Sequence, residues 1–409
     1  MDGIGKNSLS ATPNTTVRSR NQRGSGTSPL IVRDWSRTRV NGVPGAAASV
    51  DGFSVYFKGA ALGNVPERAD AFLAVSLLPA MYNGRPLDLT NLPPVSAGLL
   101  ANIERVQEIW SCWNPYLQRV PILAREEATP SEGGAITFFS GGVDAVHSVL
   151  HLGARAGRLV MINGFDFSMD DAAFASVCKR LGKLADRLGH ELLTIETNWQ
   201  SMTRHHQISR VTSHGTCLAA LAHLLHPAEA HIASSFSWAA LFPWGSHPLL
   251  DPQWSSDSVR ISHVGCDSPR VEKIALIAQQ PDLLKLLWVC SEAPVANCGR
   301  CPKCLRTRAM LSILAADTSA FPPAEGDALD PWFKMMAKGT ELVYLNEVKE
   351  VAVRKKRDDI LPKLAKSERA ALRRDVVRRL WRWLLPGLAS KRDNSITLQP
   401  WGRGPRPEL

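Results

Sequence analysis

The stretch of residues 136–146, Ile-Thr-Phe-Phe-Ser-Gly-Gly-Val-Asp-Ala-Val, constrains the fold of this chain more than any other. An apolar run rich in β-forming residues leads into a turn of small residues, and a helical apolar pattern starts directly after it. Such a strand-to-helix junction gathers free backbone N–H groups and the positive end of the helix dipole around one point. The sequence therefore predicts a phosphate site at this junction.

The side chains of the junction suit a nucleotide. Gly141 and Gly142 have no Cβ to keep a phosphate away, Ser140 adds a hydroxyl, and Asp144 adds a carboxylate on the side of a bound Mg²⁺. No Gly-Lys-Ser/Thr follows the turn, which excludes a Walker A loop, and the Gly-x-Gly-x-x-Gly fingerprint is missing as well. We expect a nucleotide-phosphate loop of another type.

The run Ser140-Gly141-Gly142-Val143-Asp144 resembles the PP-loop (Ser-Gly-Gly-x-Asp-Ser) of ATP pyrophosphatases, which cleave ATP to AMP and pyrophosphate and adenylylate a substrate. The resemblance implies ATP and Mg²⁺ as cofactors, and Ser140 and Asp144 as catalytic residues. Ala145 stands where that family has a second Ser. The implied ATP and pyrophosphate site consists of Ser140, Gly141, Gly142, Val143, Asp144 and Ala145, with Asn163 and Gly164 placed where the family holds adenine.

Short apolar strands alternate with helices downstream of a linker at residues 129–134. This alternation predicts an α/β domain with a parallel sheet and a ligand site at the carboxyl ends of its strands. The PP-loop resemblance implies the same architecture, an adenine nucleotide α-hydrolase-like domain. The strands that we expect are residues 136–139, 159–165, 191–196, 230–234 and 259–264.

More polar groups lie close to these strand ends or, at residues 213–215, at the expected start of a helix. Loops at the carboxyl edge of a parallel sheet commonly carry specificity. We expect these groups to hold the acceptor substrate, and the alternative is that they are helix caps and turns. The candidate substrate residues are Ser213, His214, Gly215, Ser234, Ser235, His247 and Asp251.

Four of the eight cysteines, Cys290, Cys298, Cys301 and Cys304, fall within fifteen residues. Two overlapping Cys-x-x-Cys turns allow thiolates to converge on one ion, and a closed set of four leaves no open position for water. The pattern predicts a structural Zn²⁺ knuckle at residues 290–304. A redox or iron–sulfur role and free buried thiols are the alternatives.

A PP-loop followed by Cys, a spacer, Cys-Gly-x-Cys-x-x-Cys and an Arg is similar to the 7-cyano-7-deazaguanine synthase (QueC-like) branch of the PP-loop family. Those enzymes use ATP and ammonia to convert a carboxylate into an amide and a nitrile, and they carry a structural zinc held by four cysteines. The likeness covers residues 135 to 310. Between the loop and the knuckle, Ser-His-Gly, Ser-Ser-Phe-Ser and Ser-His-Pro replace the branch's usual substrate signatures, so we expect a different acceptor.

The 409 residues are interpreted as four parts: a disordered tail (1–31), an α+β module of unknown role (32–130), the PP-loop domain with its knuckle (131–318), and a basic, mainly helical segment (319–409). Residues 354–382 hold 12 Lys/Arg and 4 Asp/Glu, which is most of the formal net charge of +10. This basic stretch predicts nucleic acid, an anionic membrane or a protein as partner, or a helix docked on its own domain.

The sequence shows neither an apolar run of the ~18 residues that span a bilayer nor a signal-peptide core, so we expect a cytoplasmic protein. The expected activity is that of an ATP-dependent adenylylating ligase of QueC-like type, with a small-molecule or macromolecular acceptor that the sequence does not name. Two alternatives stay open. One is a PP-loop enzyme that modifies tRNA or transfers sulfur, and the other is a non-catalytic nucleotide-binding interaction module.

Overall fold

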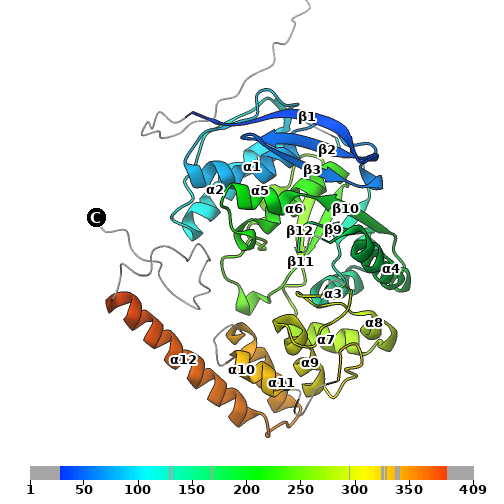
Figure 1. Cartoon of the computed structure of the whole chain (residues 1–409), viewed down its shortest axis with the longest axis vertical. Coiled ribbons are helices and arrows are strands. Elements are labelled where there is room, and N and C mark those ends of the chain that lie inside the picture. The colour runs from blue at the N-terminus through cyan, green and yellow to red at the C-terminus, as the bar shows by residue number, and fades with distance from the viewer. Residues whose placement is uncertain are drawn as a thin grey trace, which may run out of the picture.

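One mixed sheet, mostly parallel, organises the chain (Figure 1). Its strand order is β12-β11-β8-β9-β10-β3-β2-β1-β4-β6. The structure is a computed structural model, and it describes residues 28–128, 130–131, 133–166, 169–293, 295–323, 327, 329–336 and 341–384, without the side chains of residues 375 and 378–384.

The parallel half of the sheet contains the predicted α/β strands. These are β8 (Ala135–Phe138), β9 (Arg158–Asn163), β10 (Leu192–Thr197), β11 (Glu229–Ala233) and β12 (Arg260–Val264). From β8 the chain adds β9 and β10 on one side, then returns to place β11 and β12 on the other side. The strand order therefore reverses between β8 and β11, and such a switch point opens a crevice at the carboxyl ends of the strands.

The N-terminal strands continue the same sheet. β1 (Leu30–Val40), β2 (Val43–Val50) and β3 (Phe53–Lys58) are antiparallel, and β3 pairs with β10. Two short strands, β4 (Leu87–Asp88) and β6 (Ile122–Leu123), extend the edge, while β5 (Val95–Ser96) and β7 (Glu126–Glu127) pair separately. Residues 32–130 thus share a sheet with the loop domain, and the boundary at residue 130 stays a prediction. Residues 1–27 of the predicted tail lie outside the described residues, and β1 begins at Leu30.

Helices cover both faces of the sheet, and the alternation of side chains along the strands supplies a core to each face. Ile136 and Phe138 of β8 belong to one core, and Phe139 belongs to the other. The first core holds α1 (Asp70–Asn83), α2 (Ala97–Trp113), α5 (Trp199–His205) and α6 (Arg210–Leu225). The second holds α3 (Val143–Leu152), α4 (Asp171–Leu188), α7 (Arg270–Ala278), α8 (Pro281–Leu286) and α9 (Pro302–Ile313).

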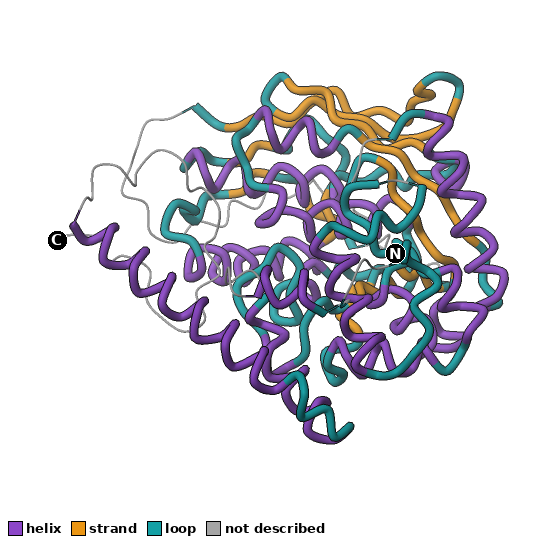
Figure 2. Tube along the Cα trace, turned by 60° about the horizontal axis from the view of Figure 1, so that its bottom comes forward, coloured by secondary structure: helices purple, strands orange, loops and turns teal. Residues whose placement is uncertain are grey.

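The C-terminal part is helical where it is described. Trp332 of α10 (Asp330–Met336) and Val348 of α11 (Leu345–Arg354) join the second core. The long helix α12 (Leu361–Leu384) packs through Leu364, whereas Leu372, Val376 and Val377 are exposed, and the helix extends along one side of the molecule (Figures 1 and 2). Residues 385–409 of the predicted basic segment lie outside the described residues. None of the described helices is long and apolar enough to cross a membrane.

Gly157 makes the turn that leads into β9 possible. Its φ is +63°, and a Cβ built on it would lie 1.9 Å from the carbonyl oxygen of Ala135. Only glycine tolerates both conditions, because positive φ strains an L-residue and the contact atom is backbone that cannot move aside.

We expect Gly157→Ala to lower the free energy of unfolding by about 3 kcal/mol, from overpacking and left-handed strain together. Gly189→Ala is the matched control, because Gly189 also has positive φ (+79°) but an added Cβ meets nothing within 4 Å. It should cost only the strain, about 1 kcal/mol. Urea unfolding of both variants measures the difference, and equal losses would contradict the close approach of Gly157 to β8.

Candidate functional site

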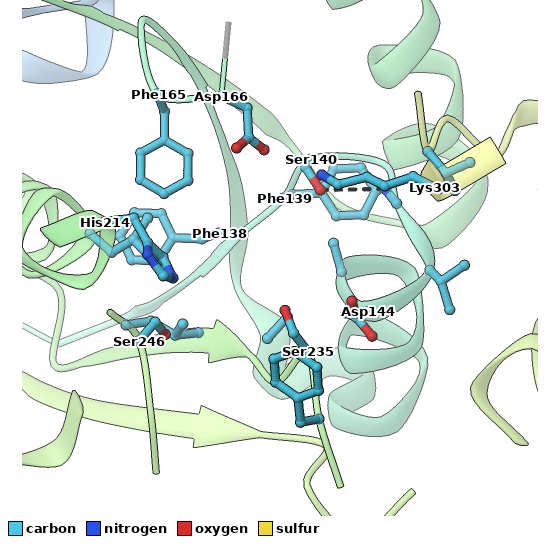
Figure 3. A pocket seen from close by; sticks show the side chains of 18 of the residues that line it. Phe138, Phe139, Ser140, Asp144, Phe165, Asp166, His214, Ser235, Ser246 and Lys303 are labelled. Atoms are coloured by element: carbon cyan, nitrogen blue, oxygen red, sulfur yellow. Dashed lines mark hydrogen bonds between the residues drawn. The ribbon is translucent and has the colours of Figure 1, made fainter. Parts of the chain in front are cut away.

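A cavity of about 500 Å³ opens at the carboxyl ends of β8, β9, β11 and β12 (Figure 3). It lies at the switch point between β8 and β11, where the strand order predicts a ligand crevice. Phe138 of β8, Ile162 of β9, Ala233 of β11 and His263 of β12 all line it. The volume is that of a small-molecule site.

The predicted phosphate loop forms one wall of this cavity. Gly141 has a φ of +72°, and a Cβ there would lie 2.3 Å from Leu181 Cδ2. Gly142 is the N-cap residue of α3, and its N–H points to Ser140 Oγ at 3.4 Å. Unlike Gly141, Gly142 lines the cavity itself, as do Ser140, Val143, Asp144 and Ala145. The loop thus presents a hydroxyl and the start of a helix to the cavity, with no Cβ at Gly142.

Asp144 is paired with two cations of α7. Its carboxylate accepts hydrogen bonds from Arg270 Nη2 at 2.5 Å and from Lys273 Nζ at 3.5 Å. Burial by itself would raise the pKa of Asp144, but the charges of Arg270, Lys273 and Arg306 outweigh it and hold that pKa below its ordinary value. Asp144 is therefore ionised at neutral pH and is held in place by basic side chains.

The C-terminal segment contributes a part of the wall that the sequence did not reveal. Tyr344, at the end of a 3-10 helix (Leu342–Tyr344), lines the cavity. The guanidinium of Arg306 lies 4.4 Å from its ring centroid and that of Arg270 lies 5.5 Å from it. Arg306 Nη1 also donates to both carboxylate oxygens of Glu341, at 3.0 and 3.1 Å. Residues 341–344 therefore hold two arginines beside the cavity.

His263 is a second functional candidate that the sequence interpretation missed. Its Nδ1 lies 2.6 Å from Oδ2 of Asp251, which is completely buried and also accepts a hydrogen bond from Ser246 Oγ at 2.6 Å. Burial would lower the pKa of His263, but hydrogen bonds to Asp251 and Cys266 raise it to about 9. His263 is thus an imidazolium at the cavity at neutral pH. Its position near the end of an expected strand was the only signal in the sequence.

The remaining walls are apolar and aromatic. Val160, Met161 and Phe165 line the side of the cavity next to β9. A group of aromatic rings forms another part of the wall, with centroids 4.5–5.9 Å apart: Phe236, Phe242, Trp244 and His214. The cavity therefore combines a polar loop with two surfaces that suit flat or apolar groups.

Neither Asn163 nor Gly164, the predicted adenine residues, lines the cavity. The Asn163 side chain bridges the loop after β9, accepting from the Met169 N–H at 2.9 Å and donating to the Met169 carbonyl at 3.1 Å. A Cβ built on Gly164 would lie 1.9 Å from the carbonyl oxygen of Thr197. Their described contacts shape the loop.

Of the predicted substrate residues, only His214 and Ser235 line the cavity. Helix α6 begins at Arg210, three residues before the expected start, so the N–H of Ser213 is bonded to the carbonyl of Ser209. The N–H of Gly215 is bonded to the carbonyl of Gly245. The predicted start at Ser213 was wrong because Ser209, whose backbone is extended, is already the N-cap residue of this helix. The others lie behind the cavity wall: Ser234 donates to Phe236 O, His247 packs on Trp113, and Asp251 holds His263.

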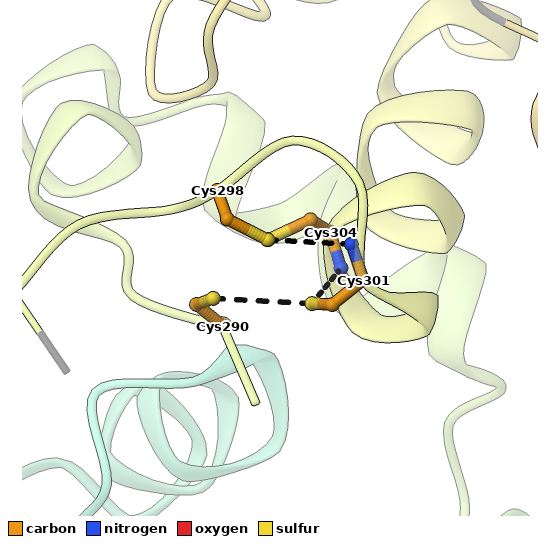
Figure 4. Close-up of side chains that lie close together, drawn as sticks. All are labelled: Cys290, Cys298, Cys301 and Cys304. Carbon is orange, nitrogen blue, oxygen red and sulfur yellow. Dashed lines mark hydrogen bonds between the residues drawn. The ribbon is translucent and has the colours of Figure 1, made fainter. Parts of the chain in front are cut away.

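The four clustered cysteines converge as predicted (Figure 4). Their Sγ atoms all lie within 4.8 Å of one another, and Cys290 and Cys301 are 3.9 Å apart. Four sulfurs at ~2.3 Å from a tetrahedral zinc are about 3.8 Å from one another, so the cluster has the size of a metal site. Backbone N–H groups point at the Sγ atoms of Cys290, Cys298 and Cys301 over 3.1–3.4 Å. The cluster could hold a metal ion such as zinc.

The chain matches no protein-family model, no curated protein and no solved structure. Its functional interpretation therefore depends on the geometry described above. Three features carry that interpretation: the loop at residues 140–145, the cavity at the switch point, and the cysteine cluster beside it.

We expect one zinc per chain in the purified protein, because four cysteine sulfurs of this spacing make a closed tetrahedral set. Elemental analysis measures the content, and Cys298→Ser should lower it, whereas Cys178→Ser, outside the cluster, should not. Iron with labile sulfide in place of zinc would contradict the zinc assignment and favour a cluster-bearing enzyme.

The His263–Asp251 pair should make stability depend on pH. Because the folded-state pKa of His263 is about 9, above its ordinary value of 6.5, the pair contributes fully below pH 6.5 and is lost as the pH rises through 9. Relative to His263→Gln, the wild-type protein should lose as much as about 3 kcal/mol of unfolding free energy over this range. Denaturant unfolding at both ends measures it, and a pH-independent difference would contradict the charged pair.

Proposed function

We propose that this protein is an ATP-dependent enzyme that transfers AMP to an oxygen of an acceptor and releases pyrophosphate. The observation that carries the proposal is the loop at residues 140–145, which opens on a cavity at the switch point of a parallel sheet. A glycine turn that leads from a strand into a helix binds phosphate groups through backbone N–H groups and the helix dipole. The resemblance of this loop to the PP-loop specifies the reaction at the α-phosphate.

We propose that all parts of ATP bind in this cavity. The pyrophosphate moiety is proposed to lie on Ser140 and Gly142, with Mg²⁺ beside Asp144. The adenine is proposed to lie against Val160 and Met161 of β9. Cations surround the phosphate region, and positive charge placed where negative charge accumulates is the main means of stabilising such a leaving group.

The proposed reaction is an in-line displacement at the α-phosphorus. An acceptor oxygen, such as that of a carboxylate, forms a bond to this phosphorus while the bond to the pyrophosphate oxygen breaks. The acceptor leaves the step as an adenylate, and ammonia or another nucleophile then displaces AMP. Loop N–H groups at residues 140–142 and the nearby cations offset the charge that accumulates on pyrophosphate.

The acceptor is proposed to bind at the other end of the cavity. There the imidazolium of His263 can receive a carboxylate, and the rings of Phe236 and Trp244 suit an apolar or flat body. His214 and Ser235 add hydrogen-bonding groups to the cavity wall. The zinc proposed for the cysteine cluster is structural, since four sulfurs leave no coordination position for a substrate.

Two observations favour a non-catalytic nucleotide-binding module as the second candidate. The carboxylate of Asp144 is already paired with Arg270 and Lys273, and Ala145 supplies no hydroxyl where PP-loop enzymes have one. A protein of this kind would bind ATP without releasing pyrophosphate. Binding and turnover must therefore be measured separately.

Gly142→Ala tests the loop with little risk to the fold. The φ of Gly142 is −84°, and an added Cβ would lie 3.4 Å from Ser140 Oγ and 3.6 Å from Trp288 O, which are tolerable contacts. The methyl group would instead occupy the face on which the phosphate is proposed to lie. We expect ATP affinity to fall about tenfold or more, because one or two charge-assisted hydrogen bonds to the phosphate would be lost. The melting temperature should stay unchanged.

Calorimetric titration with ATP and Mg²⁺ measures the binding, and a pyrophosphate-release assay with a panel of carboxylates measures turnover. Gly182→Ala serves as the control, because a Cβ there meets nothing within 4 Å and the residue lies on α4, away from the cavity lining. ATP binding that is equally tight in Gly142→Ala would place the nucleotide elsewhere. Tight binding of ATP without release of pyrophosphate for any acceptor would contradict the enzyme and favour the non-catalytic nucleotide-binding module.

A further inference from the structure

The cysteine knuckle forms part of the cavity wall. Cys290, Lys303, Arg306 and Thr307 line the same cavity as the phosphate loop. Cys290 is a member of the metal-binding cluster, and Lys303 lies between two other members in sequence. The cluster and the cavity are thus neighbouring parts of one structure.

Lys303 differs from the other cations of the cavity in having no counter-ion. Arg210 is paired with Asp166, Arg270 with Asp144 and Arg306 with Glu341. No carboxylate in the described part of the chain pairs with Lys303, and Figure 3 shows its side chain reaching toward Ser140. An ammonium group free of internal partners beside a phosphate loop is available to an anionic ligand.

Metal coordination would fix the position of this lysine. Cys301 caps the N-terminus of α9, Lys303 is in the first turn of that helix, and Cys304 follows it. Two metal ligands that flank Lys303 would leave the backbone between them little freedom. Cys290, Cys301 and Cys304 are buried members of the second core, and a bound metal would link the two segments that carry them.

The segment that leads into the knuckle is hydrogen-bonded to the phosphate loop. The N–H of Trp288 donates to the carbonyl of Gly141 at 2.9 Å. Asn297, between the cluster's first two cysteines, accepts from the N–H of Val289 and donates to the carbonyl of Leu287, both at 2.9 Å. Residues 287–289 thus connect the knuckle to the turn at Gly141.

From these contacts we infer that the knuckle is a functional wall of the phosphate site. Lys303 contacts the phosphate groups of the ligand, and the bound metal holds Lys303 and the turn at Gly141 in the binding geometry, so that metal occupancy sets the affinity for the ligand. The inference rests on the proposed function only in taking the ligand to be ATP. Inorganic pyrophosphate serves as a second probe that needs no adenine site.

The experiment compares Lys303→Ala with Arg300→Ala, both on the knuckle of the full chain. Arg300 is the matched control, because its side chain is 84% exposed and Arg300 does not line the cavity. Calorimetric titration with pyrophosphate and with ATP, each with Mg²⁺, should show affinity about tenfold or more weaker for Lys303→Ala and unchanged for Arg300→Ala. Both variants should keep the metal content of the wild type.

Cys298→Ser tests the role of the metal. Elemental analysis should show loss of the ion, and pyrophosphate affinity should fall together with it, with circular dichroism reporting whether the fold persists. Lys303→Ala that binds both probes like the wild type would overturn the inference and leave the proposed function standing. Pyrophosphate binding that depends on Lys303, in a protein that does not bind ATP, would support the inference and reject the proposed function.

Discussion

The ion pairs between Asp144 and α7 hold the candidate site together. Asp144 belongs to the helix that follows the phosphate loop, and Lys273 of α7 donates both to Asp144 and, at 2.7 Å, to the carbonyl of Ser234 just after β11. One ammonium group thus connects the helix that follows β8 with the end of β11, the two strands between which the strand order reverses. Arg270 adds a second cation and lies over Tyr344.

This arrangement also complicates any experiment on Asp144. Removing only the carboxylate would leave Arg270 and Lys273 buried without their counter-ion, and breaking a buried pair in this way costs on the order of 3–5 kcal/mol. A loss of activity would then report on the fold as much as on the reaction. A glycine of the loop, whose backbone can accept a methyl group, separates the two effects.

Local patterns in the sequence predicted the parallel strands, the junction at residues 136–146 and the convergence of the four cysteines, because each depends on residues close together in the chain. The cavity depends on distant segments. Tyr344 and Arg306 come to the loop from the C-terminal half of the chain. Folding brings His263 to Asp251, and the hydrogen bond between them raises the pKa of His263. No local periodicity records such pairings. The continuity of β3 with β10 was missed for the same reason, since the pairing joins residues 57–58 to 196–197.

The polar side chains named from sequence were less informative than the loop. Ser213, Ser234 and Asn163 bond to nearby backbone groups, which is the common role of such residues at turns and helix starts. Side chains of the same types become site residues only when the fold leaves them facing the cavity, as for Ser140 and Ser235. Polar residues near the ends of expected strands therefore predicted which edge of the sheet carries the site. They did not predict which individual side chains line it.

The proposed reaction occurs at the α-phosphorus of ATP bound on the loop at residues 140–145. The most direct test incubates the full-length protein with Mg²⁺, candidate acceptors and ATP that is radiolabelled at the α-phosphate, and separates the products by chromatography. We expect label in AMP or in an adenylylated acceptor, with no labelled ADP. Labelled ADP as the main product would show attack at the γ-phosphate and would contradict the proposed reaction.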